Sequence, residues 1–216
     1  MTTYNYDGSP QWTTYLDVDL DVKSWLQMGD VPVAGEETKL KEVVDDVCWW
    51  LQDELGRPFA PTLFAKRFSV WSGNTLMLPY YPIQSVQRVA EFWGVNGEHV
   101  LEEQTPEHQG SNEMFTIDPL RGYIVRSFQG LVPRPFFPGL RNIEVVWTAG
   151  YDPLPPPIRN ATLKQIAHEW RKEQQASRGG APQMVGEHGE VEPGLLPGML
   201  PEVKARLNNY TQVGIG

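Results

Sequence analysis

The amino-acid sequence predicts an α+β fold, in which a small helical bundle carries an inserted antiparallel β-sheet. Apolar residues recur at steps of three and four along residues 36–56, 158–175 and 201–210, as they do in helices that bury one face. The chain between the first two segments holds short β-prone runs separated by turn residues. The connections between these runs are too short for parallel crossovers, so we expect the strands to pair antiparallel.

The N-terminal segment has no hydrophobic period. Residues 1–17 are polar and aromatic, and we expect an N-terminal arm that becomes ordered only against another surface. The residues that follow, up to Met28, carry apolar side chains at helical spacing, which predicts a short helix ended by Gly29. The bundle and its insert are then predicted over residues 18–176, with the insert at about 65–148.

The helical signal strengthens at Glu36. Apolar residues from Leu40 to Leu55 fall on one stripe of a helix, whereas most acidic residues of the same segment fall elsewhere. Gly56 then ends the helix, because glycine readily adopts the left-handed conformation at a helix terminus. Burial of such side chains yields about 1.5–3 kcal/mol each, which ordering entropy largely offsets, so this helix needs packing partners.

Seven runs between the helices are the strand candidates, because they are short, β-prone and bounded by turn residues. They are Ala65–Val70, Thr75–Leu78, Ser85–Phe92, His99–Glu102, Phe115–Ile117, Tyr123–Val125 and Ile143–Trp147. Gly73-Asn74, Asn96-Gly97 and Arg121-Gly122 are predicted turns, and Asn96-Gly97 best fits the two positive φ angles of a type I′ hairpin. Pro82 is expected at a sheet edge or a bend, since proline cannot donate to a strand ladder.

The stretch Val145–Trp170 contains a strand, a turn, a rigid spacer and a helix in succession. Its first residues suit a buried strand, and Gly150 can take the positive φ that a sharp exit needs. Four prolines, ending with Pro157, then hold the backbone extended. The helix begins where the prolines stop, because proline in a first turn leaves no N–H unpaired.

The composition changes after this helix. Residues 177–198 are rich in glycine, proline and acidic side chains, which predicts a flexible loop. Residues 199–216 are expected to form a C-terminal helix and a tail. The apolar side of that closing helix consists of Leu200, Val203, Leu207 and Tyr210.

The composition favours a folded, acidic protein. The chain has 216 residues, of which 40% are hydrophobic and eight are tryptophan, and this is ample for a core. Its net charge of -9 argues against a protein that grips nucleic acid, because such proteins cluster Lys and Arg against the phosphates. We therefore expect any contact with DNA to be weak and independent of sequence.

The cysteine content and the N-terminal residues predict a cellular setting. Cys48 is the one cysteine, so no disulfide can form within the chain and a reducing compartment is expected. The first residues have neither a basic start nor an apolar run, so no signal peptide is predicted. No segment approaches the length that spans a membrane. We expect a cytosolic product without a membrane partner.

No group of residues predicts catalysis. His168-Glu169 resembles half of a zinc-protease motif, but Lys172 stands where the second histidine is needed. Cys48 neighbours acidic residues and has no histidine base, so we interpret it as a small buried or half-buried side chain. Adjacent acidic pairs such as Asp45-Asp46 point in different directions and cannot face each other across a cleft. We predict no catalytic residue, no metal ligand and no cofactor.

A proline-bound loop combines basic and aromatic residues. Arg134, Phe136 and Phe137 lie in the run PRPFFPG. Basic residues among aromatics can bind single-stranded nucleic acid by stacking, but the acidic chain makes this the weaker interpretation. A rigid aromatic loop is equally suited to a protein interface, because aromatic rings bring large contact area at low entropy cost. The three residues are therefore candidate contacts between subunits or with neighbouring proteins.

Five segments, taken in order, resemble one family of phage proteins. They are Asp19–Met28, Glu36–Phe59, Leu78–Val89, Val145–Trp170 and Gly198–Tyr210. Their order resembles that of the head-tail adaptor (connector) proteins of long-tailed bacteriophages, in the longer variety with a β-rich insert. The resemblance spans roughly residues 18–210. The chain departs from the family in its long acidic, glycine-rich segment after the main helix and in its ending NYTQ, where relatives often carry a more basic one.

The resemblance implies a structural virion protein and not an enzyme. Copies would form a ring, a dodecamer in the family, that docks under the portal protein and joins the filled capsid to a stopper or tail-completion protein. The genome would pass through the central channel without sequence-specific binding, which suits an acidic subunit. The protein would reside at the head-tail junction of the virion and in the host cytoplasm during assembly.

The family pattern also makes the closing helix, with Leu200, Val203, Leu207 and Tyr210, the candidate portal contact. The alternative interpretation is that these residues pack against the bundle of their own chain. Two other functions stay open. The first is another neck component, either a head-closure stopper or a tail-end ring protein. The second is a carbohydrate-binding or hydrolytic module, suggested only by the aromatic content.

Overall fold

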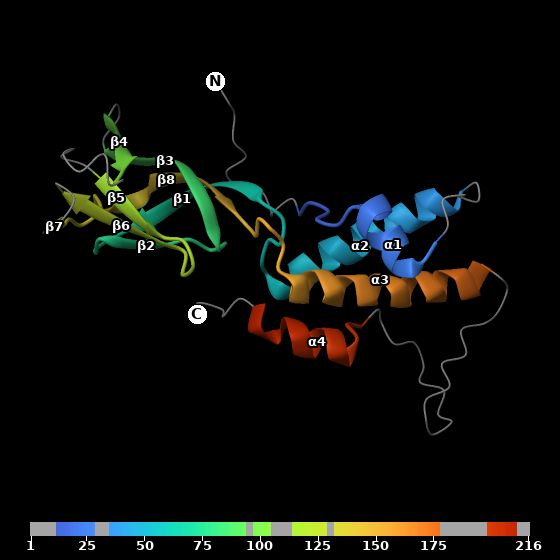
Figure 1. The fold of residues 1–216 in the computed structure, drawn as a ribbon. Helices are drawn as coiled ribbons and strands as arrows, with labels where there is room; N and C mark the ends of the chain where they lie inside the picture. The colour runs from blue at the N-terminus through green and yellow to red at the C-terminus, as the bar shows by residue number, and fades with distance from the viewer. Residues whose placement is uncertain are drawn as a thin grey trace. The chain divides into compact units, whose positions relative to one another are not determined.

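The computed structural model describes residues 12–28, 35–93, 97–104, 114–128, 132–177 and 198–210 (Figure 1). These residues form two compact units. The β unit consists of Trp12 and Arg57–Asp152, and the helical unit consists of Thr13–Gly56 and Pro153–Gly216, each over its described residues.

One sheet of eight strands makes up the described part of the β unit. Its strands are β1 (Thr62–Val70), β2 (Thr75–Met77), β3 (Ile83–Trp93), β4 (Gly97–Glu103), β5 (Met114–Asp118), β6 (Tyr123–Phe128), β7 (Val132–Pro133) and β8 (Gly139–Ala149). They follow the order β1-β8-β3-β4-β5-β6-β2, and β7 pairs with β6. The β4–β5 pair is parallel, while the other described pairs are antiparallel.

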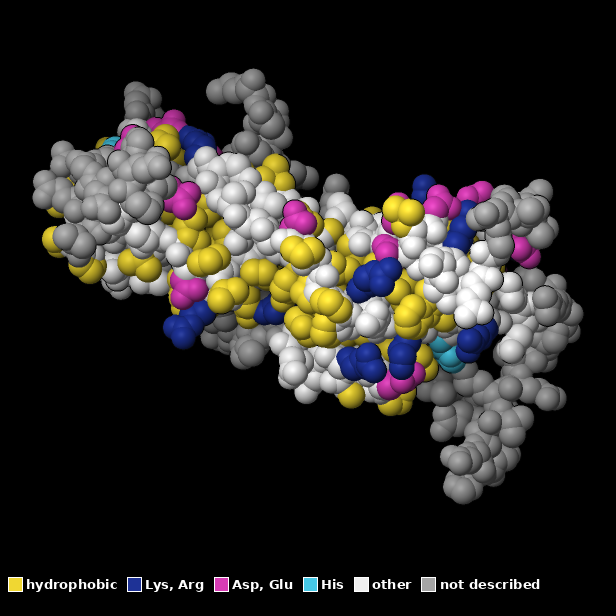
Figure 2. All heavy atoms as spheres, in the orientation of Figure 1, with side chains coloured by type: hydrophobic (Ala, Val, Ile, Leu, Met, Phe, Trp, Pro, Cys, Tyr) yellow, Lys and Arg dark blue, Asp and Glu magenta, His cyan; other side chains and the backbone are white. Residues whose placement is uncertain are grey.

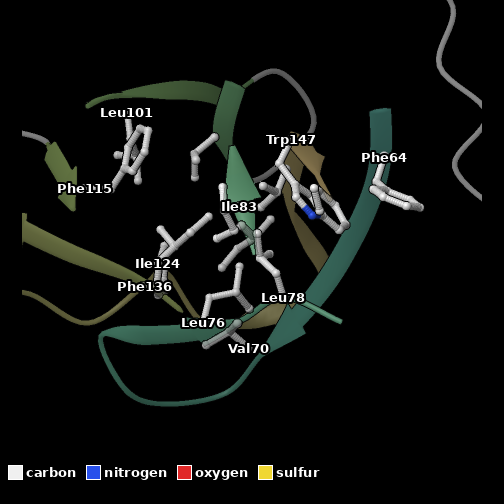
Figure 3. Close-up of a cluster of buried hydrophobic side chains, with 14 of the residues drawn as sticks. Phe64, Val70, Leu76, Leu78, Ile83, Leu101, Phe115, Ile124, Phe136 and Trp147 are labelled. Carbon is white, nitrogen blue, oxygen red and sulfur yellow. The ribbon is translucent and has the colours of Figure 1, made fainter. Parts of the chain in front are cut away.

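The core of the β unit surrounds Trp147 of β8. Figure 3 shows this side chain among buried residues that come from several strands, including Phe64 of β1 and Ile83 of β3. The Trp147 ring is fully buried, and its Nε1 donates a hydrogen bond of 3.1 Å to the backbone oxygen of Tyr80. Strand β8 lies between β1 and β3, so its backbone is paired along both edges, and its central residues, 142–147, are buried.

The exit from β8 depends on a glycine. Gly150 has a φ of 131°, a conformation that residues with a side chain rarely adopt. A Cβ atom at this position would lie 2.2 Å from the backbone oxygen of Ala60. The expected positive φ at Gly150 is therefore confirmed, and close backbone packing is a second reason for glycine there.

The helical unit is built on two long helices. Its elements are the π-helix η1 (Val18–Lys23), α1 (Ser24–Leu26), α2 (Glu36–Leu55), α3 (Pro156–Ser177), α4 (Pro201–Leu207) and the 3₁₀-helix η2 (Asn208–Tyr210). Helix α3 packs against both α2 and α4, as Figure 1 shows. Gly56 ends α2 with a φ of 62°, and its N–H donates to the backbone oxygen of Asp53. Helix α1 ends at Leu26, and its C-cap is Gln27 with a φ of 54°, whereas the sequence predicted an end at Gly29.

The predicted fold class, a small helical bundle with an inserted antiparallel β-sheet, is wrong. The eight-stranded mixed sheet dominates the described chain, and it has a core of its own around Trp147. The strands are longer than their β-prone centres, so they bury enough side chains to form a separate unit. Strands β4 and β5 pair in parallel, and the ten residues between Glu103 and Met114 come close to the dozen that such a connection usually needs.

Several predictions fall on residues outside the described part of the chain. These are residues 1–11 of the arm, Gly29, Asn96 of the hairpin turn, residues 178–197 of the loop, and the tail after Tyr210. Of the arm's remaining residues, Trp12 packs edge-on against Tyr80, with ring centroids 5.8 Å apart.

Candidate assembly surfaces

The residues considered for catalysis do not form a site. Cys48 is fully buried in α2, and this burial raises the pKa of its thiol from 9.0 to about 12. The thiol therefore stays protonated near neutral pH and is a poor nucleophile. His168 lies half-buried on α3. The described residues contain no group of three or more side chains suited to hold a metal ion.

The described helices also give no membrane-spanning segment. None of them is both long and apolar enough to cross a bilayer.

The loop predicted to form contacts, residues 133–139, presents its two phenylalanines in opposite ways. We call it the aromatic loop. Phe136 is 1% exposed and belongs to the hydrophobic core of the β unit, whereas Phe137 is 47% exposed. Arg134 is exposed as well, and its guanidinium lies 5.5 Å from the ring centroid of Phe128. Of the three candidate contacts, Phe136 anchors the loop, while Arg134 and Phe137 reach the surface.

A buried ion pair holds the aromatic loop in place. Glu91 of β3 and Arg126 of β6 lie 2.8 Å apart, and their side chains are 0% and 5% exposed. The second carboxylate oxygen of Glu91 accepts a 3.0 Å hydrogen bond from the backbone N–H of Phe137. Arg126 donates to the backbone oxygen of Pro135 at 2.9 Å. The desolvation of both charges is thus compensated by contacts that include the loop backbone.

Two further strand connections brace the same loop. The N–H of Phe136 donates to the backbone oxygen of Gly73 at 2.9 Å. The side-chain amide of Asn142, in β8, donates to the backbone oxygen of Phe137. The loop is therefore fixed from β3, β6, β8 and the β1–β2 turn. A surface held in this way loses little conformational entropy when a partner binds.

Phe137 continues into a row of aromatic rings. Its centroid lies 5.6 Å from that of Trp93, and Trp93 stacks on His99 at 5.5 Å with an interplanar angle of 26°. We call Phe137, Trp93 and His99 the aromatic row. It lies where β3 ends and β4 begins, at the same end of the β unit as β7 (Figure 1). Rigid aromatic side chains on a braced scaffold are typical anchors of protein interfaces.

The closing helix packs into its own unit. Val203 and Leu207 of α4 are fully buried. The backbone N–H of Leu200 donates to the side chain of Gln165 in α3 at 3.0 Å, and Leu200 and Tyr210 are half-buried. A partner could therefore meet α4 only through its other residues, which include the exposed Lys204 and Arg206.

Sequence patterns did not identify every residue of these surfaces. Glu91 and Arg126 stand 35 positions apart, and no local pattern marks them as partners. Trp93 and His99 lie on the two strands of a predicted hairpin. Side chains on paired strands are neighbours, so the stacking of these two rings could have been inferred from the sequence. No sequence pattern indicated a function for Trp49, an exposed tryptophan of α2.

The fold is similar to that of chains in solved particles. No protein-family model and no curated protein matches this chain. A structure titled the neck of an empty GTA particle, computed with C6 symmetry, contains a chain with 15% identity and a TM-score of 0.61, and the alignment covers 99% of this chain and 97% of that one. A chain in the virion of a native gene transfer agent (GTA) particle is 16% identical with a TM-score of 0.59, covering 98% and 96%.

A third solved chain agrees with these two. It belongs to the neck of a native GTA particle computed with C12 symmetry, has 15% identity and a TM-score of 0.53, and is covered over 97% of its length by 99% of this chain. At such low identities the likeness is one of fold, and it includes both units because nearly the whole of each chain is aligned.

Proposed function

We propose that this chain is a structural component of the neck of a phage-like particle, and that its copies assemble into a ring. The main support is that this chain shares its fold, over nearly its full length, with chains from particle necks. Those necks were computed with six-fold and twelve-fold symmetry, which is the arrangement of a closed ring. A chance likeness of a common supersecondary motif would cover one unit, not both.

Within the neck, we assign the chain to the adaptor ring between the portal protein and the stopper or tail-completion protein. The order of five sequence segments along the chain supports this position. The acidic composition supports a channel through which DNA moves without being held, because a basic lining would bind the phosphates. The chain then acts at the head-tail junction of the particle, after assembly in the host cytoplasm.

Two surfaces are proposed to make contacts in this position. Arg134 and Phe137 of the aromatic loop are braced and exposed, which suits contacts between subunits or with another neck protein. Helix α4 is proposed to face the portal through Lys204 and Arg206, since Val203 and Leu207 are already buried in the unit. In this arrangement Phe136, Val203 and Leu207 act by holding the contact surfaces in place.

A head-closure stopper or tail-end ring is the second candidate. A β-barrel without flanking helices would favour this candidate. Helices α2 and α3, of 20 and 22 residues, make a substantial helical unit, so the adaptor fits the described chain better.

Binding to portal rings tests the proposal. The purified full chain is mixed with portal rings of the same particle, and the product is sized by analytical ultracentrifugation and imaged by electron microscopy. We expect a defined ring of this chain on one end of the portal. Binding to isolated tails with none to portal rings would assign the chain to a tail-end ring instead. Turnover or saturable binding on a glycan panel, without binding to either, would favour the carbohydrate module.

A further inference from the structure

We propose that copies of this chain join head to tail through the helical unit, with Trp49 of one copy seated in a groove between α1 and α3 of the next. The inference rests on the proposed ring and names the surfaces that would close it. It is independent of the aromatic loop and of α4.

The outer face of α2 carries an exposed tryptophan in a row of carboxylates. Glu42, Asp46, Trp49 and Asp53 follow one another at helical steps of four, three and four residues, so they share one face. The apolar residues of α2 are buried on the opposite face. Trp49 is 51% exposed, although tryptophan is usually largely buried. We call these four residues the α2 stripe.

The receiving groove lies in the same helical unit, on different residues. It has a volume of about 400 Å³ and lies between the end of α1 with its following residues, Trp25 to Met28, and the second half of α3. Trp170 of α3 is almost fully buried and lines it, as do Arg171 and Gln174. Pockets that hold small ligands begin at about 300 Å³, so one indole ring fits with room for flanking atoms.

The charges of the two surfaces are complementary. Helix α2 carries seven carboxylates against two lysines. Helix α3 carries four basic residues, of which Arg159, Lys164 and Lys172 form ion pairs within the chain. Figure 2 shows the dark blue Lys and Arg side chains that lie along the α3 part of the visible face. At the groove itself, Arg171 is exposed and forms no ion pair with another described residue. An indole flanked by carboxylates therefore meets a groove of mixed polar and apolar lining, with the cation of Arg171 on its rim.

The pairing of two different surfaces on one chain sets the type of assembly. The α2 stripe and the groove have no residue in common, so each copy can donate its stripe to one neighbour and receive the stripe of another. Such a heterologous contact closes into a ring when its rotation fits a whole number of copies. The second copy is the occupant that the charges favour, because one chain offers both complementary sides.

The test compares Trp49→Ala with Trp71→Ala in the full-length chain. Trp71, in the β unit, is 72% exposed and serves as the matched control. Ring formation is followed by native mass spectrometry and analytical ultracentrifugation, and circular dichroism confirms that each variant is folded. Trp49→Ala should weaken self-association at least tenfold, as interface anchors do, while Trp71→Ala should leave it unchanged.

Charge reversal gives the second arm. Asp46→Arg and Arg171→Glu should each weaken the ring, and the double variant should recover most of the lost association, because the ion pair is restored with exchanged signs. Without such recovery, and with Trp49→Ala assembling as wild type, the inferred contact is overturned. If wild-type rings form in that case, the proposed function stands; if the wild-type chain forms no ring alone or with portal, both fail.

A cysteine pair identifies the occupant of the groove. Trp49→Cys and Gln174→Cys are combined in one chain and oxidised. Disulfide-linked multimers are expected, since the two positions meet between copies. Rings of unchanged size without disulfide links between copies would mean that positions 49 and 174 do not meet in the ring, and the proposal would then be wrong.

Discussion

Glu91 is a buried charged residue whose loss should lower the stability of the β unit. It pairs with Arg126 in the interior of the β unit and also accepts the N–H of Phe137. Glu91→Ala leaves a buried guanidinium without its carboxylate, so the free energy of unfolding should fall by roughly 3–5 kcal/mol. Urea unfolding followed by tryptophan fluorescence measures this loss.

Glu98→Ala provides the control for that measurement. Glu98 pairs with Arg88 on the surface, where its side chain is 45% exposed. Exposed ion pairs contribute about 0–1 kcal/mol, so this variant should stay close to wild type. Equal losses for the two variants would show that the buried pair does not brace the aromatic loop as described.

Cys48 should make the stability sensitive to alkaline pH. Burial raises the pKa of its thiol from 9.0 to about 12 in the folded chain, and Tyr15 is raised in the same direction, also by burial. The unfolded chain loses the thiol proton first, so stability is fully present below pH 9 and falls as the pH rises toward 12. The slope contributed by one group is at most about 1.4 kcal/mol per pH unit.

The measurement is urea unfolding of wild type and Cys48→Ala at several pH values between 8 and about 11. The alanine variant should show a shallower decline above pH 9, because one titrating group is removed. If the free energy of unfolding declined with pH equally in wild type and Cys48→Ala, burial would not raise the pKa of the Cys48 thiol.

At the scale of elements, α4 should behave as part of the helical unit. Leu207 is fully buried, so Leu207→Ala should lower the free energy of unfolding by about 2–5 kcal/mol. Lys204→Ala, at an exposed position of the same helix, should change it by less than about 0.5 kcal/mol. Thermal unfolding of the two variants checks this, and two equally mild effects would mean that α4 does not contribute to the unit's core.

The aromatic loop gives a similar pair of adjacent residues. Phe136→Ala should cost about 3–5 kcal/mol of stability, because its ring is buried in the β unit. Phe137→Ala should leave stability nearly unchanged and weaken binding within the neck, which a pull-down with portal rings or a sedimentation assay of the rings would measure. A Phe137→Ala chain that assembles like wild type would remove this residue from the proposed contacts.

Helices were predictable from the sequence because their period is local. Residues 36–56 predicted α2, which spans Glu36–Leu55. Strand centres were predictable for the same reason, but their ends and partners were not. The parallel β4–β5 pair and the two-residue β7 depend on contacts between distant segments, which no local pattern contains.

The candidate surfaces were predictable only in part. The run PRPFFPG indicated an interface, yet Phe136 and Phe137 are identical neighbours. Their different exposure is set by Glu91, Arg126 and Asn142, which hold the loop backbone from three strands. The apolar side of α4 was likewise visible as a pattern, but the pattern did not say whether Val203 and Leu207 face α3 or a partner protein.

At the scale of the whole molecule, the proposed function depends on the complete fold and on no single residue. The shared fold with chains of particle necks extends over both units, and the order of five segments led independently to a neck component. The composition argues against tight binding of nucleic acid, because a chain with a net charge of -9 repels phosphates. A ring of acidic subunits around moving DNA is consistent with all three observations.

Imaging of intact particles tests this account most directly. Particles that carry this chain with a small tag inserted at the C-terminus are imaged by cryo-electron microscopy, and the tag is located by difference against untagged particles. We predict a ring of tag density at the junction between head and tail, with one position per copy. Tag density on the capsid surface or at the distal end of the tail, or particles that lack the chain altogether, would contradict the account.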